Sequence, residues 1–195
     1  PAIAQWNLAR LAEALLPLLH PDSNKAMALA EEKIEGFSDL YGACWNAMMR
    51  RKLGLLGENA EDPRLIKDLL DWMHRSGADY TNTFRLLGTD GSLGGGIYSE
   101  PVFLDWRARW QARRANNLKP QTPQSRPMQE ANPVYIPRNH QVEAALNAAV
   151  QSGDLGPFNK LLDVLAQPYA EREGLEAYTE PDPGGAEGYQ TFCGT

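Results

Sequence analysis

The stretch Asp62-Pro-Arg-Leu-Ile-Lys-Asp-Leu-Leu-Asp-Trp-Met-His-Arg-Ser-Gly77 decides the fold class. Its apolar residues recur at spacings of three and four, the period of a helix with one buried face: Leu65, Ile66, Leu69, Leu70 and Met73. Aspartate followed by proline is typical of a helix N-terminus, and the glycine at the other end is typical of a helix stop. The stretch therefore predicts a core-facing helix over 62–76.

The same period continues on both sides of this stretch. In residues 2–19 it predicts a helix with a broad core-facing side: Ile3, Trp6, Leu8, Leu11, Leu15, Leu18 and Leu19. Further helices are expected over 22–53, from about 79 to 87, from 101 past Trp110, from Asn139 to about Gly153, and from Phe158 to before Pro168. Strand-like alternation of useful length is absent from the sequence. We therefore predict an all-α fold of about seven helices.

Local signals set the ends of the first two helices. The pair His20-Pro21 should stop the first, because proline disfavours the α conformation in the residue before it, and Asp22 or Ser23 can cap the second. Gly54 should end the second in a left-handed conformation. Cys44 lies on the apolar stripe of this long helix, so we expect it to be a small, buried core residue.

Two segments are rich in residues that break regular structure. Five of the twenty residues in 119–138 are proline, which predicts an extended Pro-rich crossing loop without any regular element. Five glycines in 88–96 predict a second loop, a helix connector. This glycine loop lacks the Lys-Ser/Thr pair of a phosphate-binding P-loop, and no predicted strand precedes it.

The charge pattern divides the chain into a helical portion, 1–167, and an acidic C-terminal tail, 168–195. The net charge of the chain is −6, and in the tail six carboxylates accompany a single arginine, Arg172. A solvated terminus is favoured for such a tail over a partner-binding arm.

Composition excludes several classes of protein. With 195 residues, 43% hydrophobic and 23% charged, the chain is typical of a soluble globular protein. The longest apolar run, 11–19, is interrupted by Glu13 and Pro17, so a membrane span is not expected. Two cysteines and the absence of a signal-peptide pattern favour the cytoplasm. Residue 1 is proline and the helical pattern has begun by Ile3, so we expect a piece of a longer chain.

Few residues carry recognisable chemistry. The three histidines share no metal-ligand spacing with each other or with a cysteine, so no metal site is predicted: His20, His74 and His140. In the stretch Trp106-Arg-Ala-Arg-Trp-Gln-Ala-Arg-Arg114 both tryptophans fall on a core-facing stripe with Phe103, whereas Arg109 and Arg113 share another side open to carboxylates. Nucleic-acid binding is therefore not expected. Cys193, near the end of the chain, is either an incidental cysteine, which composition favours, or an exposed reactive thiol.

Five strings occur in an order that resembles the C-terminal part of the selenoprotein O (YdiU) family. They are Gln5-Trp-Asn-Leu-Ala-Arg-Leu-Ala-Glu-Ala-Leu15, Met49-Arg-Arg-Lys-Leu-Gly-Leu55, Gly77-Ala-Asp-Tyr-Thr-Asn-Thr-Phe-Arg85, Asn132-Pro-Val-Tyr-Ile-Pro-Arg-Asn139 and Leu161-Leu-Asp-Val-Leu-Ala-Gln-Pro-Tyr169. The resemblance runs from about Pro1 to Thr195.

The resemblance implies a kinase-like enzyme that transfers AMP from ATP to Ser, Thr or Tyr hydroxyls of proteins, with Mg as metal. It places the nucleotide, base and metal residues upstream of this chain, so no catalytic, cofactor-binding or metal residue is assigned here. It also implies a redox role for Cys193, because family members commonly end with a Cys or selenocysteine near the terminus; the ending Phe-Cys-Gly-Thr differs somewhat from the expected one. Cys44, on its helix stripe, is a poor disulfide partner.

Two functions follow as expectations. In the first, the chain is the helical C-terminal portion of a protein adenylyltransferase, with the upstream catalytic half and protein substrates as partners, and is inactive alone. In the second, it is an independent helical protein-interaction module that binds a protein along the Pro-rich loop and the helix with the tryptophans. Neither function involves nucleic acid or a membrane.

Overall fold

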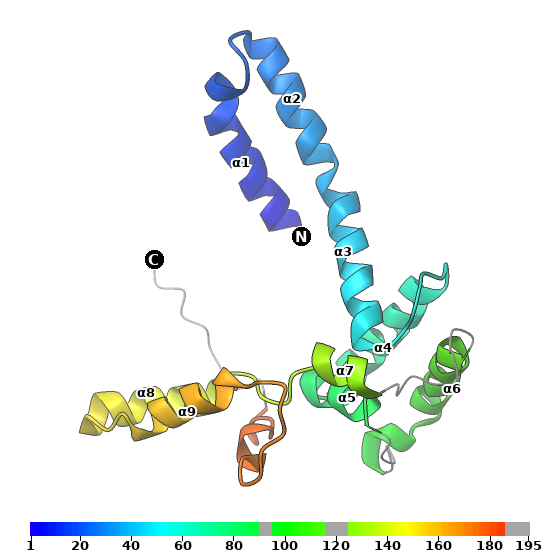
Figure 1. Ribbon diagram of the computed structural model, residues 1–195, viewed down its shortest axis with the longest axis vertical. Helices are drawn as coiled ribbons and strands as arrows, with labels where there is room; N and C mark the ends of the chain where they lie inside the picture. Colours follow the sequence, from blue (N-terminus) through cyan, green and yellow to red (C-terminus); the bar gives the residue numbers. More distant parts are fainter. Residues whose placement is uncertain (90–94, 116–124, 186–195) are drawn as a thin grey trace. The chain divides into compact units, whose positions relative to one another are not determined.

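The computed structural model describes residues 1–89, 95–115 and 125–185. For residues 125–127 it describes the backbone only. The described residues form α-helices and two short 3-10 turns, Gly96–Ser99 and Glu176–Tyr178, and contain no strand (Figure 1). The α-helices are α1 (Ala2–Leu19), α2 (Ser23–Glu35), α3 (Phe37–Lys52), α4 (Asp62–Ser76), α5 (Tyr80–Leu87), α6 (Pro101–Ala115), α7 (Ser125–Ala131), α8 (Asn139–Ser152) and α9 (Gly156–Ala166). The predicted all-α class is confirmed.

The helices belong to two compact units, 1–50 and 51–195. In the first unit α1 packs along α2 as a helical hairpin (Figure 1). His20 is extended and ends α1, and the Asp22 carboxylate accepts hydrogen bonds from the amides of Asn24 and Lys25, as the predicted cap of the next helix. The turn of the hairpin was therefore encoded locally.

The expected core-facing side of α1 is wrong, since no residue of α1 is buried. The exposed apolar residues of this helix include Trp6, at 56%, and Leu18, at 81%. The spacing is helical, as predicted. Among the described elements, however, α2 is the only one with which α1 makes extensive contact. A stripe of apolar side chains defines the face of a helix that favours burial. It does not specify which element of the structure, if any, covers that face.

The helix expected over 22–53 is two helices, α2 and α3, divided at Gly36. Glycine has the highest cost of ordering in a helix apart from proline, which explains the division at this residue. Cys44 is exposed in α3, so the expectation that it is a buried core residue is wrong. Its stripe forms instead an aromatic series, with ring centroids of Phe37 and Tyr41 6.0 Å apart and those of Tyr41 and Trp45 6.5 Å apart.

α4 and α6 pack on each other in the core of the second unit. The buried face predicted for each helix is confirmed, except that Leu70 of α4 is only half-buried. Phe103, Trp106 and Trp110 of α6 are at most 3% exposed, and the Trp106 indole N–H donates to the carbonyl of Leu65 in α4 at 2.9 Å. The Trp110 N–H donates to the carbonyl of Leu53 at 2.9 Å. Each indole therefore contributes apolar area and satisfies a backbone acceptor outside its own helix.

The expectation that 119–138 contains no regular element is wrong for α7. This helix starts at Ser125, which places Pro127 in its first turn. The amides of the first turn have no partner inside a helix, so proline is tolerated there. Met128 of α7 is fully buried, and its side chain lies against Gly54, where an added Cβ would come within 2.8 Å of it. Gly54 has the positive φ, 64°, expected for a helix stop.

The C-terminal part of the second unit contains the hairpin α8–α9 and the chain that follows it. Gly153 ends α8 with φ of 68°, as predicted. Val134, Tyr135, Val164 and Leu175 form a small buried cluster that joins the segment before α8, α9 and the chain after it. The proposed division at residues 167 and 168 stays a prediction.

Candidate functional site

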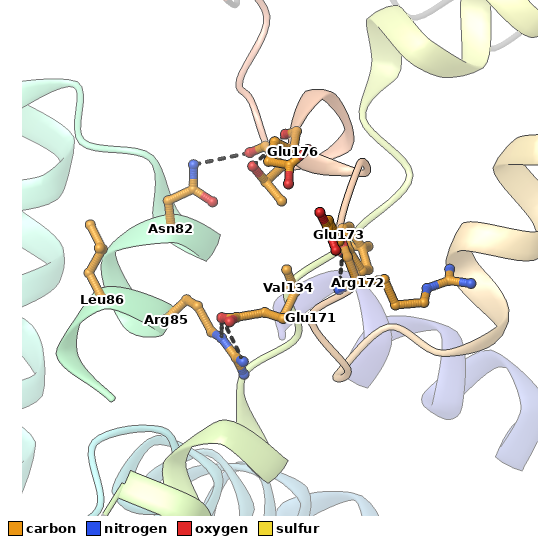
Figure 2. Close-up of a pocket in the computed structure, with 10 residues that line it drawn as sticks. Asn82, Arg85, Leu86, Val134, Glu171, Arg172, Glu173 and Glu176 are labelled. Atoms are coloured by element: carbon orange, nitrogen blue, oxygen red, sulfur yellow. Dashed lines mark hydrogen bonds and ion pairs between the residues drawn. The ribbon is translucent and has the colours of Figure 1, made fainter. Parts of the chain in front are cut away.

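A pocket of about 550 Å³ lies in the second unit between α5, the segment before α8 and the chain after α9 (Figure 2). Asn82, Arg85 and Leu86 of α5 form one side. The remaining lining residues are Val134, Tyr135, Glu171, Arg172, Glu173, Glu176 and Thr179. The lining residues that the structure describes include no His, Cys or Lys, so a hydroxyl or thiol nucleophile paired with a histidine or lysine base is not found among them.

Arg138 and Asp79 form the central ion pair beside this pocket. The Arg138 guanidinium binds both carboxylate oxygens of Asp79, with Nη2 3.0 Å from Oδ1. The same nitrogen donates to Asn82 Oδ1 and to the carbonyl of Thr179, at 3.3 and 2.9 Å. The Asn82 amide also donates to that carbonyl, at 3.1 Å. Three segments far apart in sequence are therefore held by one fork of donors.

Arg85 makes a second junction of this kind (Figure 2). Its Nη2 lies 3.0 Å from the Glu171 carboxylate, and its Nη1 donates to the carbonyls of Gln129 and Asn132, at 3.3 and 3.2 Å. The side chain of Arg85 is 13% exposed, whereas that of Glu171 is 67% exposed. The Arg85 guanidinium is thus bonded within the protein, and the Glu171 carboxylate is the member of the pair that solvent or a ligand can reach.

Asn132 extends the network to the end of α3. Its side-chain amide donates to the carbonyls of Lys52 and Met128, at 2.8 and 2.9 Å, and the residue is fully buried. The Lys52 ammonium lies 4.7 Å from the ring centre of Phe84, and burial lowers the pKa of this lysine.

Tyr135 and Arg172 hold the far side of the pocket. The Tyr135 hydroxyl accepts the amide N–H of Arg172 at 3.0 Å. The Arg172 guanidinium points away from Glu171 and binds Asp163 and the carbonyls of Asp163 and Val164 in α9 (Figure 2). Both pocket arginines are therefore neutralised by the protein, which leaves carboxylates as the groups open to a ligand.

The Asp79 carboxylate should make the fold sensitive to acid. Burial alone would raise the pKa of Asp79, but the hydrogen bond from Arg138, the amides of Asn82 and Thr81 and the positive charge of Arg138 hold it below its ordinary value. A carboxyl group whose pKa is lowered in the folded state adds stability above its unfolded pKa, about 3.9, and this stability is lost as the pH falls through the folded pKa. We expect the urea midpoint of the wild-type chain to fall more between about pH 5 and pH 3 than that of Asp79→Asn. An equal fall of the urea midpoint in the two proteins over this pH range would contradict the prediction.

The residues singled out from the sequence have different outcomes. Cys193 lies outside the described residues, as does the middle of the 88–96 loop. Arg109 binds Asp68 and Asp105, and Arg113 binds Asp62, so the predicted pairing of these arginines with carboxylates is confirmed. In residues 1–89, 95–115 and 125–185, no three His, Cys, Asp or Glu side chains are grouped as metal ligands would be. No described helix is long and apolar enough to cross a membrane.

The network links strings that the sequence analysis connected only by resemblance. Asp79, Asn82 and Arg85 belong to one string, Asn132 and Arg138 to another, and the Pro168 carbonyl of a third accepts the amides of Val134 and Tyr135, at 2.7 and 3.1 Å. Individual roles for these residues were missed. The only signal was the unusual composition of the strings, because ion pairs between residues 59 positions apart leave no periodic pattern.

The family model described as Protein adenylyltransferase SelO matches residues 1–166. The chain belongs to the SelO family. The resemblance to this family is confirmed. The strings that the network brings together therefore belong to a SelO chain.

Curated relatives match this SelO chain over its whole length. Proteins named protein nucleotidyltransferase YdiU are 51% identical to it in Nitrosococcus oceani, 46% in Alcanivorax borkumensis and 44% in Alkaliphilus metalliredigens. Each alignment covers 100% of the chain and 40% of the relative. The SelO chain therefore spans about 40% of the length of the nucleotidyltransferases that it matches.

Proposed function

We propose that the chain is the C-terminal helical portion of a SelO protein adenylyltransferase, which transfers AMP from ATP to Ser, Thr or Tyr hydroxyls of proteins. The observation that carries this proposal is the match of the whole chain, at 51% identity, to a relative named protein nucleotidyltransferase. Its role in the enzyme is to support the catalytic lobe and help to shape the surface that receives the protein substrate.

The nucleotide and Mg sites of this enzyme lie, in the proposal, outside the 195 residues. Mg and cationic groups would stabilise the phosphate charge during the transfer. The described residues do not fit such a site: acidic side chains are not grouped as metal ligands there, and the arginines of the pocket are bound to carboxylates and carbonyls of the chain. We therefore assign no step of the transfer to a residue of this chain.

Cys193 keeps its proposed redox role through disulfide formation. The disulfide partner is proposed to lie outside the chain. Cys44, predicted to be a poor partner because of its place on the helix stripe, is exposed in α3.

The proposed activity can be tested by supplying the part of a relative that the chain does not cover. We expect the 195-residue chain alone to bind no ATP-Mg in titration calorimetry and to transfer no labelled AMP. Co-expressed with the remaining portion of the Nitrosococcus oceani relative, it should support transfer of labelled AMP to protein. Micromolar ATP binding by the chain alone, or the absence of transfer by the purified combination, would contradict the proposal.

The alternative, an independent interaction module, is less well supported. Its expected binding surface was the Pro-rich loop together with α6, the helix that bears the tryptophans. Trp106 and Trp110 are 1% and 3% exposed, as their core-facing stripe predicted, so a partner on α6 would have to contact the other faces of this helix. A buried indole offers no surface to a docked protein.

A further inference from the structure

Four leucines form an exposed stripe along α1. Leu8, Leu11, Leu15 and Leu18 follow one another at intervals of three, four and three residues, which places them on one face of the helix. Their exposed fractions are 39%, 54%, 39% and 81%. We call these four residues the leucine stripe.

The hairpin that α1 forms with α2 does not use the leucine stripe. The half-buried residues of α1 are a different set, also at intervals of three and four: Gln5, Ala9, Ala12 and Leu16. The Gln5 side-chain amide donates to the carbonyl of Ile34 in α2 at 3.2 Å, and Ala26 of α2 is 1% exposed. The hairpin contact therefore uses two alanines, Gln5 and Leu16 of α1, and the leucine stripe lies outside it.

This arrangement leaves residues 1–50 with very little core. All fifty residues are described, and the buried apolar ones among them are Ala26 and Met49. A unit of this size has difficulty burying enough apolar area by itself, and a contiguous exposed apolar face commonly marks an interface. The leucine stripe is therefore a surface that lacks its partner.

The chemistry of the helix specifies an apolar partner. Arg10 and Glu13, the charged residues of α1, lie outside the leucine stripe and form an ion pair with each other. The stripe thus has no charge with which to select a charged ligand, and apolar burial is the interaction that it can offer. Relatives 44–51% identical to the whole chain carry, in the same polypeptide, the further 60% of length that this chain lacks. A surface within one polypeptide meets its partner at high effective concentration.

We propose that the leucine stripe of α1 is the docking surface for the portion of the SelO polypeptide that this chain does not cover. The inference rests on the proposed function in so far as that portion is the catalytic one. It requires an apolar face on that portion that can receive leucines up to ten residues apart along α1, from Leu8 to Leu18.

Co-purification tests the docking surface. The 195-residue chain is co-expressed with the uncovered portion of the Nitrosococcus oceani relative, and the amount of partner retained on the tagged chain is measured. We expect Leu11→Glu and Leu15→Glu each to reduce the retained partner by at least about tenfold, because a carboxylate must be desolvated at the centre of an apolar contact. Arg10→Glu introduces the same side chain one position away, about 100° around the helix and outside the leucine stripe, and should stay within about twofold of the wild type.

A photo-cross-linking amino acid at Leu11 identifies the occupant directly. A cross-link to the co-expressed portion, with circular dichroism of the glutamate variants unchanged, supports the proposal. A cross-link to a second copy, or to residues 51–195 of the same chain, overturns it. Retention of the partner by Leu11→Glu, or failure of the wild type to retain it, also overturns the proposal.

AMP transfer, measured on the same purified complex, separates this inference from the proposed function. A complex that is cross-linked through Leu11 but transfers no AMP contradicts the activity and leaves the docking surface standing. A complex that transfers AMP and is not cross-linked through Leu11 contradicts the docking surface alone.

Discussion

Arg113→Met is expected to lower the free energy of unfolding by about 3–5 kcal/mol, the largest loss for a single ionic substitution in the described residues. Arg113 Nε lies 2.8 Å from Asp62 Oδ1 and its Nη2 lies 3.1 Å from Oδ2, and Asp62 is fully buried. Nη2 also donates to the carbonyls of Leu56 and Gly57, both at 3.2 Å. Methionine keeps the length of the side chain but leaves a buried carboxylate without its cation, which is the costly part of breaking such a pair. Urea unfolding followed by circular dichroism measures the change.

Arg109→Met is the matched control on the same helix. Arg109 lies one turn before Arg113 and binds Asp68 and Asp105, but its side chain is 43% exposed. An exposed ion pair contributes little, so this substitution should cost less than about 1 kcal/mol. The double variant Asp62→Asn/Arg113→Met should cost less than the sum of its single substitutions, since the two groups are coupled. Equal losses for Arg109→Met and Arg113→Met would contradict the role given to burial.

Arg138→Met should destabilise the second unit by about 2–3 kcal/mol and separate the three segments around the pocket. The side chains of Arg138 and Asp79 are 9% and 21% exposed, so the pair is less buried than that of Arg113. The substitution also removes the donors to Asn82 and to the carbonyl of Thr179. Because Thr179 lies beyond α9, we expect faster hydrogen exchange in residues 168–185 as well as a lower urea midpoint.

Arg138→Lys provides the comparison that separates charge from geometry. Lysine keeps the positive charge but cannot present the planar fork that binds both oxygens of Asp79. It should recover at most about half of the stability lost in Arg138→Met. Full recovery of the lost stability by Arg138→Lys would show that charge alone is sufficient. Unchanged hydrogen exchange of residues 168–185 in Arg138→Met would contradict the role of Arg138 as a junction between the three segments.

Much of the secondary structure followed from residues close together in sequence. The helix predicted from Asp62 ends at Gly77, which has φ of 69° in the structure, and Asp79 caps α5 through the amide of Asn82 at 2.8 Å. Caps and left-handed stops involve neighbouring residues, so they can be recognised in a sequence. The loop predicted over 119–138 was wrong for α7, because Pro127 falls in the first turn of this helix, where a proline removes no intrahelical hydrogen bond.

The pocket could not be predicted from these local patterns. Its walls depend on Arg85, whose partners Glu171 and Asn132 lie 86 and 47 residues away. Such distances carry no period, and several carboxylates in the chain could have paired with this arginine. The strings quoted for the family resemblance contained Arg85 and Asn132, yet the resemblance assigned them no contact.

The sequence by itself determined the helical class, most helix ends, the pairing preference of Arg109 and Arg113 and the membership of the SelO family. Only the tertiary structure decided which apolar faces are covered: Phe103 of α6 is fully buried, whereas Leu18 of α1, in an equally regular stripe, is 81% exposed. It also corrected Cys44 from buried to exposed. The physical reason is that periodicity reports the face on which a helix favours burial, and the loss of contact with water depends on whether another surface occupies that face.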